Sequence, residues 1–150
     1  TPIKSSAASD VYKRQVLCIG GRPDGEPFKV GVQKPFADRN ETAAVVDING
    51  RSVVSSGIYE RCFKQDGKLY HHILDPHTGY PYDNGLISVT IISDRSVDGD
   101  ALSTTCFALG LKKGLAFAEK KGVQAVFITK DYELHYTKDF QKKIKVSQVD

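Results

Sequence analysis

Side chains capable of chemistry are concentrated in residues 70–81, whose sequence is YHHILDPHTGYP. They are His71, His72, Asp75 and His77. We expect a strand over residues 69–74 that stops at the following Asp-Pro, because proline cannot donate to a sheet ladder and restrains the residue before it. Thr78 and Gly79 then supply a turn. A polar loop held by the end of a rigid strand is a common position for catalytic or binding residues.

The histidines of this segment do not have the spacing of a metal site. Successive residues of a strand point to opposite faces, so His71 and His72 cannot easily ligate one ion. One of them is expected to face the core or a pocket, and the other to face water. A pocket histidine with a pKa near ~6.5 can act as a general base or contact a phosphate. A histidine that is simply hydrogen-bonded at a strand end is the alternative, and spacing leaves both open.

A second set of polar side chains lies at residues 100–104. Asp100 and Thr104 are four residues apart, so on a helix they project from one face, with Ser103 close to it. A carboxylate with one or two hydroxyls is a hard oxygen set that suits Mg²⁺ bound to a substrate phosphate. The exposed amides of a helix start also favour a phosphate nearby. Capping of the helix N-terminus by these side chains is the alternative.

The composition is that of one domain, or part of a larger one: 150 residues, of which 40% are hydrophobic. The net charge of +3 is small and its charges are interspersed, which gives no case for nucleic acid or an anionic membrane as partner. The three cysteines lack CxxC spacing, so we expect free, buried thiols. No apolar run approaches the ~20 residues that span a bilayer.

The pattern of elements indicates an α+β fold. Strands are expected at residues 16–19, 28–32, 43–48, 52–54, 59–63, 69–74, 86–92, 123–129 and 134–136. Pro23-Asp24-Gly25 is expected to close one hairpin, and Asn49-Gly50 another between residues 43–48 and 52–54. Ser55-Ser56-Gly57 is expected to interrupt the strand, where backbone amides can approach a ligand phosphate. Antiparallel strands followed by two consecutive helices are typical of α+β proteins.

The two helices are expected over residues 100–109 and 112–121. Asp98 is the predicted N-cap of the first, and Gly110 and Gly122 are the predicted ends. The tail after residue 137 is polar, with a basic cluster that we expect to be solvated. The chain begins at Thr1 and has no Met, which predicts a processed chain or a fragment. Residues 1–15 are expected to be disordered or foreign to the fold.

Four sequence blocks together resemble the ApbE family of FAD:protein FMN transferases. They are PFKVGVQKP (27–35), VVSSGIYER (53–61), HHILDPHTGYP (71–81) and DALSTTCFALG (100–110). The resemblance runs from about residue 16 to residue 140. It implies a T-fold-like α+β architecture of antiparallel sheets flanked by two helices, truncated at the amino-terminal side. Residues 16–150 are then the carboxy-terminal portion of such a domain.

The resemblance also implies an activity and its residues. Family members bind FAD and Mg²⁺, transfer FMN through a phosphoester bond to a Thr or Ser hydroxyl of an acceptor protein, and release AMP. The implied metal ligands are Asp100 and Thr104, with Ser103 beside them. The implied flavin-contacting set is His72, which is also the catalytic residue, together with Ile73, Asp75 and Ser55. With the amino-terminal half of the family's site absent, we expect this chain to be inactive alone.

Two other functions remain open at this point. An FAD pyrophosphatase would use the same groups, with water in place of the acceptor hydroxyl. A flavin-binding module without catalysis is favoured by the truncation, whereas retention of Asp100, Thr104 and His72 argues against it. The resemblance further implies an exported, membrane-anchored lipoprotein on the outer side of the cytoplasmic membrane. Its implied partners are the acceptor flavoprotein subunits of membrane redox complexes.

Overall fold

The computed structural model describes residues 15–38, 41–59, 61–144 and 146–148. Its strands are β1 (Gln15–Leu17), β2 (Phe28–Gln33), β3 (Thr42–Ile48), β4 (Ser52–Gly57), β5 (Cys62–Gln65), β6 (Lys68–His71), β7 (Leu86–Ser93), β8 (Gln124–Thr129), β9 (Leu134–Tyr136) and β10 (Val146–Gln148). Its helices are α1 (Ser96–Lys120) and α2 (Phe140–Lys143). The segment expected to be disordered or foreign lies almost wholly outside these residues.

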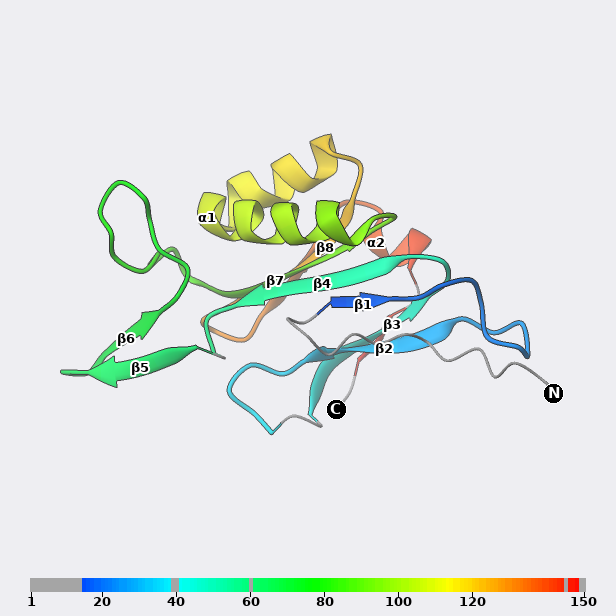
Figure 1. Cartoon of the computed structure of the whole chain (residues 1–150), viewed down its shortest axis with the longest axis horizontal. Helices are drawn as coiled ribbons and strands as arrows, with labels where there is room; N and C mark the ends of the chain where they lie inside the picture. The colour runs from blue at the N-terminus through cyan, green and yellow to red at the C-terminus, as the bar shows by residue number, and fades with distance from the viewer. Residues whose placement is uncertain (1–14, 39–40, 60, 145, 149–150) are drawn as a thin grey trace.

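The middle layer is an antiparallel sheet with the strand order β1-β4-β7-β8-β9 (Figure 1). β7 lies at its centre, paired with β4 and β8, and every residue of β7 is buried. Its sequence, LISVTIIS, is rich in β-branched residues, which suit a strand that is covered on both faces. The expected central strand over residues 86–92 is therefore confirmed.

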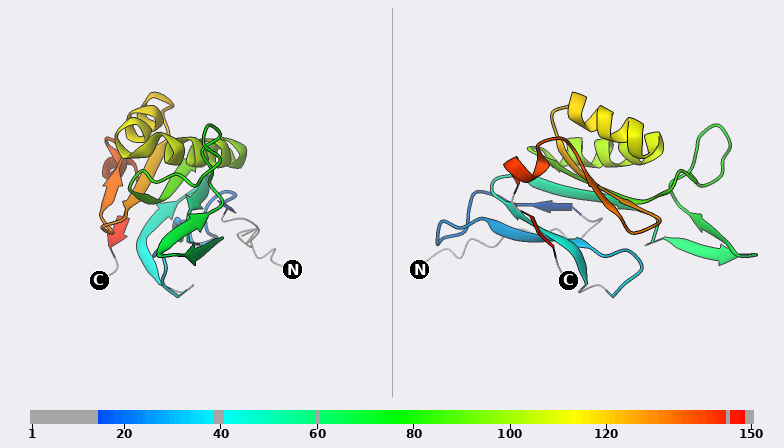
Figure 2. Two further views of the ribbon diagram at one scale, coloured as in Figure 1. Left: turned by 90° about the vertical axis from the view of Figure 1, so that its left-hand side faces the viewer. Right: turned by 180° about the vertical axis from the view of Figure 1, so that it is seen from behind.

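The two faces of this sheet are covered by different layers. α1 lies on one face, and a three-stranded sheet with the order β10-β3-β2 lies on the other (Figure 2). The core under α1 comprises Ile58, Ile73, Leu86, Ile87, Val89, Ile91, Cys106, Phe107, Ala118, Ala125 and Phe127. The core between the sheets comprises Cys18, Val32, Ala44, Val46, Ile48, Val53, Ile92, Val126, Ile128, Phe140 and Ile144. The expected α+β class is confirmed.

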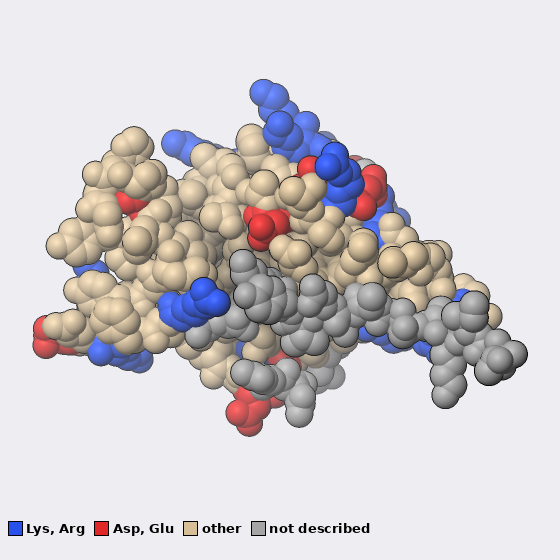
Figure 3. Space-filling model, viewed as in Figure 1, with Lys and Arg blue, Asp and Glu red and all other residues tan. Residues whose placement is uncertain are grey.

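The β5–β6 hairpin projects from one end of these layers (Figures 1 and 2). Phe63 and Tyr70 stack across it with ring centroids 5.2 Å apart. Lys68 lies 5.7 Å from the centroid of the Tyr70 ring and 5.6 Å from that of Tyr80, which belongs to the loop after β6. Figure 3 shows Lys and Arg side chains gathered over the helical layer, where several lysines of α1 are exposed.

α1 consists of two helical segments that meet at Gly110. This glycine has φ 76° and ψ 174°, which lie outside the helical region, so the chain turns there and the two segments lie side by side (Figure 1). The two expected helices are therefore confirmed. The first begins earlier than expected, however: Ser96 is its first residue and Arg95 is its N-cap, without a side-chain cap hydrogen bond. Asp98 lies inside the first turn, so the prediction that it is the N-cap was wrong.

The Asn49-Gly50 turn does not join two paired strands, as the sequence predicted. β3 pairs with β2 and β10, whereas β4 pairs with β1 and β7, so the turn carries the chain from one sheet to the other. Gly50 has φ 61°, and its N–H donates to the carbonyl of Gly20. The segment containing Pro23 likewise connects β1 and β2, which belong to different sheets. The strands of each pair lie in two sheets that face each other across one core, to which Ile48 of β3 and Val53 of β4 both contribute.

Three further expectations about elements were wrong. Ser55, Ser56 and Gly57 do not interrupt β4 but complete it, since their backbone pairs with β7. The strand predicted over residues 59–63 begins instead at Cys62, because Ile58 and Tyr59 form a turn. The tail after residue 137 is not simply polar: it contains α2 and β10, and Phe140 and Ile144 are buried in the core between the sheets.

In the part of the chain that the structure describes, no helix is both long enough and apolar enough to cross a membrane.

The close packing of the two segments of α1 on β8 generates a test of this fold. A β-carbon on Gly114 would lie 2.6 Å from the carbonyl oxygen of Cys106 and 2.8 Å from the ring of Phe127. We expect Gly114→Ala to lower the free energy of unfolding by about 1–3 kcal/mol, because the added methyl group overpacks this contact. Urea unfolding followed by circular dichroism measures the change.

Lys113→Ala is the matched control, because Lys113 is adjacent and exposed. Its effect should stay within about 0.5 kcal/mol. An unfolding midpoint for Gly114→Ala equal to that of the wild type would show that the two segments and β8 do not approach this closely.

Candidate functional site

Asp100 and Thr104 lie on the first segment of α1, and both side chains are exposed. They are one helical turn apart, so they share a face of the helix as the sequence predicted. They belong to the second and third turns rather than to the helix start. The capping alternative is therefore excluded for these two residues, since the free amides of the helix N-terminus precede them.

Hydroxyl groups connect this face of α1 to β4. The Oγ of Ser56 lies 2.8 Å from the Oγ of Ser103 and 3.1 Å from the Oγ1 of Thr104. The Oγ of Ser103 in turn donates to the main-chain carbonyl of Asp100 at 3.1 Å. Ser103 is 0% exposed, whereas Thr104 is open to solvent. The structure thus brings Asp100, Ser103 and Thr104 together, and adds Ser56 to them.

The donor set fits Mg²⁺ better than a softer metal. The exposed Asp100 carboxylate and the Thr104 hydroxyl are hard oxygen donors, and Mg²⁺ commonly uses one or two such groups plus waters and a phosphate. Among the described residues, no three or more His, Cys, Asp and Glu side chains gather as a metal-binding group. The segment with three histidines therefore does not form a site of the kind that zinc uses.

His71 is buried and held by two main-chain groups. Its Nε2 donates to the carbonyl of Tyr82 at 3.0 Å, while its Nδ1 accepts the N–H of Ile73 at 3.3 Å. Its ring also meets the ring of Phe107 edge to face. Burial lowers the pKa of His71, and the acceptor carbonyl of Tyr82 opposes that effect only in part. A neutral imidazole whose nitrogens are both engaged is a structural group.

His72 is exposed, directly after the last residue of β6. Among the described residues it has no hydrogen-bond partner. The prediction that one of the two histidines faces the core and the other faces water is confirmed. His72 is the one whose ring nitrogens remain available to a ligand.

The loop that follows His72 is built by Asp75. Its Oδ1 accepts the N–H of His77 at 2.9 Å, and its carbonyl accepts the N–H of Gly79 at 2.8 Å. Ile73 is buried in the core under α1, where its carbonyl accepts the N–H of Tyr82. These contacts fix the backbone that follows the exposed His72.

The loop is attached to α1 where the helix kinks. The Nδ2 of Asn84 donates to the carbonyl of Phe107 at 2.6 Å, and its Oδ1 accepts the N–H of Leu86 at 3.3 Å. Phe107 contacts His71 as well. Because Phe107 is on the same helical segment as Asp100 and Thr104, the histidine loop and the oxygen donors are positioned by one packed unit.

Ser55 and Ser56 face opposite sides of β4. The Oγ of Ser55 lies 2.8 Å from the Oγ1 of Thr90 on the neighbouring β7, whereas Ser56 faces α1. The structure therefore does not bring Ser55 together with Asp100 and Thr104. Sequence reasoning missed Ser56. If β4 is taken as continuous, side chains alternate between its two faces, and this alternation identifies Ser56 as the serine on the face opposite to Ser55. The residue pattern instead predicted an interruption of the strand at these residues.

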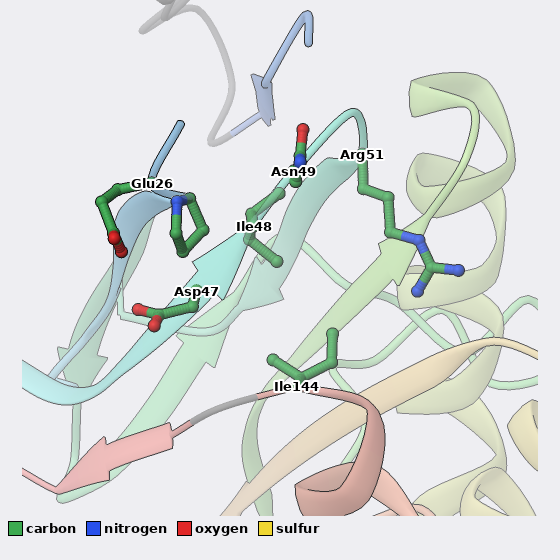
Figure 4. Close-up of a pocket in the computed structure, with 7 residues that line it drawn as sticks. Glu26, Asp47, Ile48, Asn49, Arg51 and Ile144 are labelled. Atoms are coloured by element: carbon green, nitrogen blue, oxygen red, sulfur yellow. The ribbon is translucent and has the colours of Figure 1, made fainter. Parts of the chain in front are cut away.

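Several cavities lie outside this group, and two of them are close to charged groups that the structure pairs. One of about 650 Å³ is lined by Glu26, Pro27, Asp47, Ile48, Asn49, Arg51 and Ile144. In Figure 4, Ile48 and Ile144 face each other across it, with Glu26 on one side and Arg51 on the other. Two of its charged groups are already paired, Asp47 with Lys29 at 3.0 Å and Arg51 with Asp94 at 3.2 Å.

The second cavity, of about 300 Å³, lies beside His71 and is lined in part by Lys68, Tyr82, Asp83 and Lys130. Lys130 forms an ion pair with Asp83 and lowers the pKa of that carboxyl group through their hydrogen bond. The ammonium group of Lys130 is therefore already paired with a carboxylate. Neither cavity includes Asp100 or His72 in its lining.

The two buried cysteines, Cys18 and Cys106, are unsuited to act as a nucleophile or a metal ligand. Cys18 and Cys106 are buried and Cys62 is partly buried, all as free thiols. Burial raises the pKa of Cys106 to about 11, so its thiol is protonated at neutral pH. The expectation of buried free thiols is confirmed for Cys18 and Cys106.

Comparison with known proteins shows the family. The sequence model of the ApbE family matches residues 14–127. An FAD:protein FMN transferase of Klebsiella pneumoniae is 51% identical over 125 residues, which cover 81% of this chain and 39% of that protein. One of Treponema pallidum is 42% identical over 120 residues, covering 79% and 33%. The crystal structure of the ApbE protein of Thermotoga maritima superposes with a TM-score of 0.78 at 33% identity, covering 87% of this chain and 42% of that one.

The chain belongs to the ApbE family. The predicted resemblance is confirmed, and the fold is shared with solved flavin transferases. The chain spans between one third and two fifths of the length of the two curated relatives described above.

The buried His71 makes the stability of this unit depend on pH. Folding lowers the pKa of His71 from its unfolded value near ~6.5, so just below that pH the unfolded chain binds a proton that the folded chain does not. Stability is therefore lost as the pH falls below ~6.5, until the folded pKa is reached. His71→Gln keeps one donor and one acceptor but cannot titrate. We expect it to flatten the dependence of the unfolding free energy on pH between about 7 and 5.

Urea unfolding at a series of pH values measures this slope. His77→Gln is the matched control, because His77 is an exposed histidine of the same loop, and it should leave the slope as in the wild type. An undiminished slope for His71→Gln would assign the acid sensitivity to other groups.

Proposed function

We propose that this chain forms the metal- and phosphate-binding part of an Mg²⁺-dependent FAD:protein FMN transferase. The reaction moves FMN from FAD to a Thr or Ser hydroxyl of an acceptor protein and releases AMP. The observation that carries the proposal is the pair of exposed oxygen donors on α1, Asp100 and Thr104, of which Thr104 is hydrogen-bonded to Ser56 of β4. Membership of a family whose relatives are named FAD:protein FMN transferase supports it.

The reaction requires charge neutralisation at phosphate and an activated hydroxyl. The acceptor oxygen forms a bond to the phosphorus on the FMN side, and the bond from that phosphorus to the AMP oxygen breaks. Asp100 and Thr104 would hold Mg²⁺, which when bound neutralises charge on the phosphate oxygens. Ser103, whose buried hydroxyl already donates to the Asp100 carbonyl, would support these ligands from within the helix.

His72 would accept the proton of the acceptor hydroxyl. Its ring is exposed, whereas both ring nitrogens of His71 are engaged with main-chain groups. A positioned general base is typically worth about 10²–10⁴-fold in rate. Ile73 and Asp75 would contribute by fixing the loop that carries His72. Three points stay predictions from the family resemblance. They are the flavin contacts of Ser55 and Asp75, the use of subunits of membrane redox complexes as acceptors, and export to the outer side of the cytoplasmic membrane.

The intact mass of a threonine-bearing acceptor domain tests the activity. The acceptor is incubated with FAD and Mg²⁺, and with the chain either alone or joined to the remaining portion of the Klebsiella relative. We expect the joined protein to add one FMN unit, and the addition to stop when Mg²⁺ is chelated. Free FMN without any gain in acceptor mass would favour an FAD pyrophosphatase. FAD binding without either product would favour a module that does not catalyse.

The role of His72 has its own test. We expect His72→Ala in the joined protein to slow FMN transfer by about 10²–10⁴-fold while FAD binding weakens but remains detectable, because the proton acceptor is lost. Rates come from the acceptor mass over time, and FAD binding from fluorescence quenching. His77→Ala, in the same exposed loop, is the matched control and should transfer at the wild-type rate. Undiminished transfer by His72→Ala would remove His72 from the catalytic role.

A further inference from the structure

Ser56 contacts both hydroxyl-bearing residues of the oxygen-donor face, although it lies on another element. Its Oγ is 2.8 Å from the Oγ of Ser103 and 3.1 Å from the Oγ1 of Thr104. A hydroxyl group has one proton to donate and two lone pairs to accept. The direction of each bond in this group can therefore be worked out from the one whose direction is certain.

That bond is the one between Ser103 and the carbonyl of Asp100. A carbonyl oxygen only accepts, so the single proton of Ser103 is directed to it, at 3.1 Å. In its contact with Ser56, the Oγ of Ser103 must then be the acceptor, so the single hydroxyl proton of Ser56 is donated to Ser103. The Oγ of Ser56 is left to accept, and its remaining partner, Thr104, must donate to it.

The proton of Thr104 therefore points toward β4. The hydroxyl proton of the neighbouring Thr105 has a different direction, because it is donated to the carbonyl of Ala101 at 2.8 Å within the helix. The lone pairs of the Thr104 oxygen remain free on the exposed side of α1, where the Asp100 carboxylate also lies. A hydroxyl that ligates a cation has to direct its proton away from that cation, and this arrangement does so before any cation arrives.

We propose that Ser56 is a positioning residue, which accepts the Thr104 proton and thereby presents the Thr104 oxygen as a ligand to a divalent cation. The proposal rests on the proposed function for its cation site. Ser56 itself does not touch the cation or the substrate.

The same two elements offer a matched control. The Oγ of Ser52 on β4 lies 2.8 Å from the Oγ of Ser96 on α1, two helical turns before Thr104. This pair is a hydroxyl contact between β4 and α1 of the same length, without a link to Thr104. If Ser56 only fastens α1 to β4, removal of either serine hydroxyl should have the same consequences.

The experiment measures binding of Mn²⁺, used as the probe for Mg²⁺, by electron paramagnetic resonance of free Mn²⁺ with and without FAD. We expect Ser56→Ala to raise the Mn²⁺ dissociation constant about 10-fold, the order found when an outer-shell partner of a metal ligand is removed. Ser52→Ala should bind as the wild type does, and Ser56→Thr should restore affinity because it keeps the hydroxyl. Urea unfolding of each variant checks that both alanine variants lose comparable stability.

Equal Mn²⁺ affinity for Ser56→Ala and the wild type would overturn the proposal, and so would an equal loss in Ser52→Ala. A wild-type chain that binds no Mn²⁺ in either condition would also overturn it. If Ser56→Ala does not fold, Ser56→Thr and Ser56→Val replace it, since they differ chiefly in the hydroxyl and the same criterion applies. FMN transfer is followed with the same variants joined to the remaining portion of the Klebsiella relative: Mn²⁺ binding that depends on Ser56, without transfer by the joined wild-type protein, would remove the proposed function alone.

Discussion

The close contact between α1 and β4 is the constraint on which the candidate site depends. A β-carbon on Gly99 would lie 2.7 Å from the Cγ2 of Val54 and 3.0 Å from the Oγ of Ser93, so only a residue without a side chain allows the helix to lie this near the strand. At this separation serine is long enough to reach across. The hydroxyl contacts of Ser52 and Ser56 with α1 follow from it. Gly99 thus allows the helix and the strand to approach closely, and the serine hydroxyl groups fix the rotation of the helix about its own axis.

The central sheet separates this site from the rest of the core. One face carries α1 and the histidine loop, and the other face packs on the three-stranded sheet. Because Phe107 contacts both His71 and Asn84, the loop that presents His72 is fixed to the helix that presents Asp100 and Thr104. Two groups of polar side chains that are about thirty residues apart in the sequence are therefore held by one apolar core.

Much of the secondary structure could be predicted because the signals are local. The run over residues 86–92 has the composition of a buried strand, and Gly110 and Gly122 mark helix ends by conformations that other residues rarely adopt. The expectation failed where pairing partners are distant. Asn49-Gly50 has the composition of a hairpin turn, yet β3 and β4 belong to different sheets, which pack face to face so that Ile48 and Val53 share one core.

The sequence by itself determined the family and the α+β class. It also supplied the candidate cation ligands and the candidate proton acceptor, since these depend on residue type and on spacing along the chain. Only the tertiary structure decided which histidine is buried, that Ser55 faces Thr90 and that Ser56 reaches Thr104. Side chains alternate between the faces of a strand, so a shift of one residue exchanges a site residue for a core residue. Which face is which is set by the layers packed on either side, and those layers come from segments far apart in the chain.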